Sequence, residues 1–249
     1  MKGDKLMDII IILLLIFLIL AIILQDIFNP PTYTRFALPL PQPPGQPPLP
    51  PFIYFDIDTR FTPSEVSRIK TVISDVLVQW KGHLTQKWNG GLNNGVSSWA
   101  ACTNMYAFNR LKPVWQLTPV PNGLTALNEA MDLFTQRFIE NGFGGIVGKI
   151  HYHIPIPITS STIRGQTAFR RNNVPLSITV NPTQIDRGDI TNGVLEGSLV
   201  HAWLHRVGYT HPANTYTTYF SGEAPMCYMR GYLPKNPAVP DSIYTQFFD

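Results

Sequence analysis

The sequence is poor in cysteine and in charge, and it contains no internal repeat. Two cysteines among 249 residues exclude a cysteine-rich zinc module and a disulfide-dense scaffold. Charged residues make up only 14% of the chain, and a net charge of +3 is too small and too dispersed to indicate a nucleic-acid-binding protein. What remains is the composition of a globular domain with a separate apolar segment near its start.

Residues 9–24 form an unbroken apolar run, which predicts one N-terminal transmembrane helix. No small-x-small cleavage site follows the run, so we expect an uncleaved signal anchor and not a removed signal peptide. Lys2 and Lys5 precede the run, whereas the first basic residue after it is Arg35. The positive-inside rule therefore predicts a single-pass membrane protein with a cytoplasmic N-terminus and an extracytoplasmic C-terminal domain.

The segment after the apolar run is rich in proline. Ten prolines between residues 29 and 51 favour polyproline II structure, which predicts a semi-rigid stalk. The chain then divides into three parts: residues 1–28 as a short cytoplasmic tail and signal anchor, residues 29–51 as the stalk, and residues 52–249 as one folded domain.

Hydrophobic periodicity predicts both helices and strands in the folded domain. Helices are expected at residues 63–82, at residues 125–141 and after residue 191, the first of them opened by a capping box of Thr62 and Glu65. The predicted strands span residues 52–58, 144–157 and 175–182, with shorter ones near residues 105–108 and 114–117.

Three histidines carry the strongest functional signal. His201, His205 and His211 stand in the spacing H-x-x-x-H-x-x-G-x-x-H, with Gly208 at the glycine. Positions i and i+4 share one face of a helix, so His201 and His205 can bind one metal ion together. Gly208 can take a positive φ, end the helix and return the chain, which brings His211 to the same ion. Three imidazoles with one open position are typical of a catalytic zinc site.

This pattern resembles the metzincin clan of zinc metallopeptidases, whose motif is H-E-x-x-H-x-x-G-x-x-H followed by a methionine-containing turn. The segment Ala224–Tyr228 looks like that turn. The resemblance implies an α+β zincin-like domain with a mixed twisted sheet, a zinc-binding active-site helix and a Met-turn. It also implies Met226 beneath the metal and Tyr228 as a possible contact to the zinc or to the transition state. The sequence departs from the family at Ala202, where the family has its general-base glutamate.

The departure at Ala202 leaves more than one function open. In the family, zinc polarises the scissile carbonyl while the glutamate takes the water's proton and passes it to the leaving amine, and alanine has no proton to exchange. The resemblance implies a zinc-dependent endopeptidase that acts on extracytoplasmic proteins or peptides, here in an inactive form. A natural pseudopeptidase that binds zinc, peptides or partner proteins without cleavage is the alternative, and an anchored binding domain without metal is a third account. Glu223 is a poor substitute for the base, and Ala202→Glu is expected to create or restore proteolysis.

Other residues allow paired interpretations. His151 and His153 are expected on one side of a strand, where they form either a second metal site or one half-exposed face. Cys102 and Cys227 form a disulfide in an exported domain, or they are two separate buried thiols. Peptide substrates are expected to lie antiparallel along a sheet edge, which the resemblance places at the 144–157 strand.

Overall fold

The computed structural model describes residues 7–17, 30–44, 47–88, 95–157 and 159–249. The chain divides into two compact units, residues 1–33 and residues 34–249, and each unit is considered by itself. The metal-binding histidines and all but the start of the sheet lie in the second unit.

The first unit contains a helix over residues 7–17, with its apolar side chains exposed. At 1.5 Å per residue this helix is about 16 Å long, about half of a hydrocarbon core. Residues 18–24 of the predicted transmembrane run lie outside the described residues. Within the described ranges, no helix has the length and apolar character needed to cross a bilayer. This finding contradicts the predicted transmembrane helix, and with it the predicted single-pass topology.

The second unit is α+β and is built on one mixed five-stranded sheet. Its strands are β1 (Tyr33–Pro39), β2 (Phe52–Asp58), β3 (Gly148–Tyr152), β4 (Ile163–Arg164) and β5 (Ile178–Val180). Its longer helices are α2 (Pro63–Trp88), α3 (Ser98–Tyr106), α4 (Gly123–Gly142), α6 (Asn192–Arg206) and α7 (Phe220–Met229). Two short helices complete it, α5 (Pro182–Ile185) and α8 (Ser242–Thr245).

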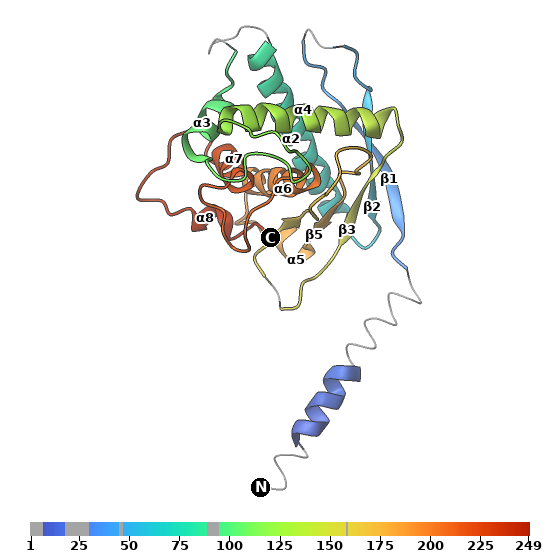
Figure 1. The fold of residues 1–249 in the computed structure, drawn as a ribbon. Coiled ribbons are helices and arrows are strands. Elements are labelled where there is room, and N and C mark those ends of the chain that lie inside the picture. The colour runs from blue at the N-terminus through green and yellow to red at the C-terminus, as the bar shows by residue number, and fades with distance from the viewer. Residues whose placement is uncertain (1–6, 18–29, 45–46, 89–94, 158) are drawn as a thin grey trace. The chain divides into compact units, whose positions relative to one another are not determined.

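The strand order in the sheet is β1-β2-β3-β5-β4. Strands β2, β3 and β5 are parallel neighbours, and β4 pairs antiparallel with β5. Figure 1 shows β1, β2 and β3 side by side, with α2, α4, α6 and α7 grouped on one side of them. The sequence predicted that a peptide would pair with the 144–157 strand, which is β3. Because β3 has a neighbour on each side, it cannot be the edge that receives a peptide. The edge strands are β1 and β4.

The proline-rich segment is part of the folded unit from residue 34 onward, which corrects the predicted stalk. Strand β1 joins the sheet beside β2, and the Arg35 guanidinium lies 2.8 Å from the Asp56 carboxylate. Leu38, Leu40 and Leu49 are buried in the core. Proline is tolerated here because β1 is an edge strand, where a missing N–H need not break a ladder. Residues 29, 45 and 46 of the predicted stalk lie outside the described ranges.

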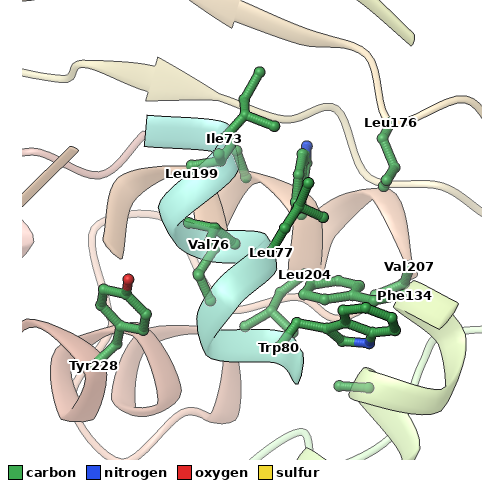
Figure 2. Close-up of a cluster of buried hydrophobic side chains, with 14 of the residues drawn as sticks. Ile73, Val76, Leu77, Trp80, Phe134, Leu176, Leu199, Leu204, Val207 and Tyr228 are labelled. Carbon is green, nitrogen blue, oxygen red and sulfur yellow. The ribbon is translucent and has the colours of Figure 1, made fainter. Parts of the chain in front are cut away.

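Helix α2 begins at the predicted capping box. The Thr62 N–H donates to the Glu65 carboxylate at 2.6 Å, and the Glu65 N–H donates to the Thr62 hydroxyl at 3.3 Å. The apolar face of α2 then packs against α6 and α4. Figure 2 shows Leu77 and Trp80 of α2 with Leu204 of α6 and Phe134 of α4 in this core.

The region 95–122 differs from the prediction. The structure has α3 where a strand was expected near residues 105–108, and it forms no strand at residues 114–117. The local reason is a helix start at Ser97, whose hydroxyl accepts the N–H of Ala100 at 3.0 Å. The buried side chains of Trp99 and Cys102 then pack α3 against the core.

Candidate metal centre

Helix α6 holds two of the three histidines in a fixed position. Its first turn is capped by the Thr191 hydroxyl, which accepts the Val194 N–H. In its last turn, the fully buried Trp203 stacks on Phe55 of β2 and meets Phe134 of α4 edge to face. The helix is therefore anchored to the sheet and to α4 at the turn that bears His201 and His205.

Gly208 ends this helix and sends the chain back toward His211. It has a φ of +89°, its N–H donates to the His205 carbonyl at 2.9 Å, and the Tyr209 N–H donates to the Leu204 carbonyl at 2.9 Å. These two bonds form a Schellman motif, which places glycine at the left-handed position. A Cβ atom at Gly208 would lie 2.0 Å from the Trp115 ring. Both the backbone conformation and the space require glycine.

Gly208→Ala is expected to destabilise the fold by about 2 kcal/mol or more, because a left-handed L-residue is strained and its methyl group meets Trp115. Urea unfolding of the metal-free protein measures this loss. Gly188→Ala is the matched control, since Gly188 has no positive φ and no atom within 4 Å of its added Cβ. Equal unfolding midpoints for the two variants would contradict the assigned role of Gly208.

The three histidines meet at their Nε2 atoms. The Nε2 of His205 lies 3.2 Å from that of His201 and 3.2 Å from that of His211. His201 is fully buried and His205 is 6% exposed. The loop after Gly208 therefore delivers His211 to the face that His201 and His205 share, as the spacing predicts.

Backbone carbonyls define which nitrogen of each ring carries its proton. The Nδ1 atoms of His201, His205 and His211 each lie 2.8 Å from a carbonyl oxygen, those of Ser221, Tyr209 and Pro212 respectively. A carbonyl can only accept, so each Nδ1 carries the hydrogen and each neutral ring presents a bare lone pair at Nε2. Lone pairs that face one another at 3.2 Å, as those of His205 face those of His201 and His211, repel one another unless a proton or a metal cation lies between them. A hydrogen bond from the second ring nitrogen is the usual support of a metal-bound histidine.

The protonation of the site agrees with metal binding. Burial lowers the pKa of His201, and it lowers the pKa of His211 to about 4. Both rings are therefore neutral at neutral pH, and neutral imidazole is the form that binds metal.

A carboxylate joins the histidines from the last residue of the sequence. Asp249 Oδ1 lies 2.7, 3.5 and 3.9 Å from the Nε2 atoms of His201, His205 and His211. His201, His205, His211 and Asp249 together can hold a metal ion.

The spacing of the four atoms suits zinc. Tetrahedral coordination with bonds of about 2.0–2.1 Å separates ligand atoms by about 3.3–3.4 Å. The measured separations of 2.7–3.9 Å bracket this value. Nitrogen and carboxylate oxygen are also ligands that zinc accepts. The residues present are thus of types that can hold a metal ion, zinc among those that such ligands accept.

Position 202 carries no proton acceptor, and Glu223 does not replace one there. Ala202 is fully buried, and the chain at Gly165 passes so close that a Cβ there would lie 2.0 Å from the Ala202 carbonyl. Glu223 is also buried, but its carboxylate lies 2.7 Å from the Lys235 ammonium and accepts the Thr218 N–H. Glu223 therefore supports the loop that carries His211 and is not a substitute base.

The predicted Met-turn is helical. Residues 220–229 form α7, in which Met226 is fully buried, and the group that this helix contributes to the histidines is the Ser221 carbonyl. The apolar side chain stacked on His201 is instead Phe248, at 4.3 Å between ring centroids and 2° between planes. The Tyr228 hydroxyl donates to Glu196, away from the histidines, so the implied contact to the zinc is not observed.

The tyrosine beside the histidines is Tyr216. Its ring centroid lies 4.7 Å from that of His211 and 5.8 Å from that of His201. Sequence reasoning missed Tyr216, Phe248 and Asp249 because none stands at a fixed spacing from the motif.

The structure distinguishes the alternatives for the two remaining pairs, His151 with His153 and Cys102 with Cys227. His151 and His153 form no metal cluster, because the group with Asp249 is the single set of three or more potential ligands that converges in the described ranges. Cys102 of α3 and Cys227 of α7 are joined by a disulfide.

No family model, curated protein or solved structure is significantly similar to this chain. The likeness to metzincins therefore rests on the residues of the histidine motif alone.

Proposed function

We propose that residues 34–249 form a zinc-binding domain of the metallopeptidase type that, with Ala202 in its sequence, does not hydrolyse peptide bonds. His201, His205 and His211 hold the zinc ion. The observation that carries this proposal is the convergence of three Nε2 lone pairs, each oriented by a backbone carbonyl at 2.8 Å. Such an arrangement is unfavourable without a cation.

The resemblance supports a scaffold descended from a zinc-dependent endopeptidase that acts on proteins or peptides. Bound zinc supplies a Lewis acid and an activated water. The chain supplies no group at position 202 to accept the proton of that water, and loss of a general base costs about 10²–10⁴-fold in rate. A peptide partner would pair with β4, because β4 is the edge strand beside the zinc helix.

The purified chain is expected to carry one zinc ion, and His205→Ala is expected to abolish binding. Zinc at about 1,000 times its dissociation constant stabilises the native state by about 4 kcal/mol, so a chelator should lower the melting temperature of the unmodified chain. Elemental analysis and thermal unfolding with and without chelator measure both effects.

His153→Ala is the matched control, since it removes an exposed histidine outside the cluster. It should bind zinc as the unmodified chain does. The proposal fails if the unmodified chain takes up no zinc on titration, or if it cleaves denatured casein at a rate that a chelator abolishes.

A further inference from the structure

We propose that the segment Gln246–Asp249 is an intramolecular ligand that closes the metal centre. Its backbone binds beside the edge strand, Phe248 packs on a metal-binding histidine, and the Asp249 carboxylate takes the fourth position at the metal. This inference rests on the proposed metal binding and adds that the bound ion is shielded from external ligands.

The backbone of this segment is held where a peptide partner would pair. Thr162 precedes β4, and its carbonyl accepts the Asn181 N–H at 2.9 Å on the side of β5. Its N–H donates to the Phe247 carbonyl at 3.1 Å. The Ser160 hydroxyl donates to the Gln246 carbonyl at 2.6 Å. The segment is therefore held by donors that lie directly before β4, beside the sheet edge where a peptide would approach.

Aromatic packing fixes the segment over the histidines. Phe248 is only 3% exposed, and it lies between His201 and Tyr216, whose ring centroid is 5.4 Å away. The Tyr216 hydroxyl in turn donates to the Asp249 carbonyl oxygen. These contacts come from α6 and from the loop that bears His211, so the segment bridges both parts of the metal centre.

The carboxylate completes the set of ligands. Asp249 Oδ1 lies within 3.9 Å of all three Nε2 atoms. A catalytic zinc site keeps this fourth position for water or substrate, whereas four protein ligands form a closed site. The arrangement therefore predicts a metal that external anions reach only when the segment moves away.

Access to the metal can be measured on the full 249-residue chain loaded with cobalt(II), whose visible spectrum reports its ligands. Acetohydroxamate, a small bidentate anion, is titrated into the unmodified chain and into Asp249→Ala. If the segment occupies the site in nine molecules of ten or more, Asp249→Ala should bind the hydroxamate about tenfold more tightly or better. Asp249→Asn, which keeps the size of the side chain, should change the affinity in the same direction.

Asp189→Ala is the control, because it removes a carboxylate from an exposed ion pair with Arg187 and should behave as the unmodified chain. Equal hydroxamate affinities for the unmodified chain, Asp249→Ala and Asp249→Asn, with cobalt bound in all three, would overturn the closure and leave the proposed metal binding intact. Failure of the unmodified chain to take up cobalt would overturn both.

Discussion

The double variant Ala202→Glu/Asp249→Ala is expected to hydrolyse denatured casein in a metal-dependent manner, about 10²–10⁴-fold faster than the unmodified chain. Position 202 lies about 60° around the helix from His205, at the edge of the metal-facing side, so a glutamate there can reach a water on the metal. Glutamate is also a good helix former, but Ala202 is fully buried beside the chain at Gly165, so thermal unfolding of each variant is measured to show that α6 is intact. The sequence predicts that this substitution alone suffices. The carboxylate of Asp249 beside all three histidines is the reason to remove it as well.

The control for this experiment is Ala202→Gln/Asp249→Ala, which has nearly the same shape but no proton acceptor. Casein and a peptide library are assayed for each protein with and without a chelator, after zinc content has been measured. A double variant that binds one zinc ion and cleaves nothing would refute the peptidase ancestry of the scaffold. A structural role for the metal would then take its place.

Loss of the Cys102–Cys227 disulfide is expected to lower the free energy of unfolding by about 5 kcal/mol by the chain-entropy relation. The bond joins α3 to α7 across 125 residues of sequence, so it restricts a large part of the unfolded chain. Small domains have a total stability of about 5–15 kcal/mol, which makes this loss a large fraction of the whole. Urea unfolding in the presence and absence of a reductant measures the difference.

Cys102→Ala/Cys227→Ala provides the comparison for this measurement. Its unfolding midpoint should not respond to the reductant, whereas that of the unmodified chain should fall. Labelling of the denatured, unreduced chain should find no free thiol. Two labelled cysteines, or midpoints that ignore the reductant in both proteins, would contradict a stabilising bond.

Local signals in the sequence predicted much of helix α6 and of the loop that follows it. The spacing of His201, His205 and His211 and the glycine between them act within eleven residues, so their geometry follows from the helix and its end. The capping box at Thr62 and Glu65 is similarly local and predicted the start of α2. These features depend little on the rest of the chain.

The features that sequence reasoning missed depend on distant contacts. Asp249 reaches the histidines through hydrogen bonds of Gln246 and Phe247 to residues 160–162, which no spacing in the sequence indicates. Strand β1 was not predicted, because the prolines around it indicated a polyproline II stalk. An edge strand tolerates such prolines. The Met-turn was inferred from residue types alone. Residues 220–229 form a helix even though Pro225 lies within them.

The carbonyl groups that orient the three histidines have a consequence for how this site changes under mutation. Many metal sites use a carboxylate side chain to orient a ligand, and a single substitution removes it. Here the acceptors belong to the main chain at Ser221, Tyr209 and Pro212, so replacing any of those side chains leaves the acceptor atom in place. Substitutions at these positions, and at position 202, therefore leave the carbonyl groups that orient the three histidines in place.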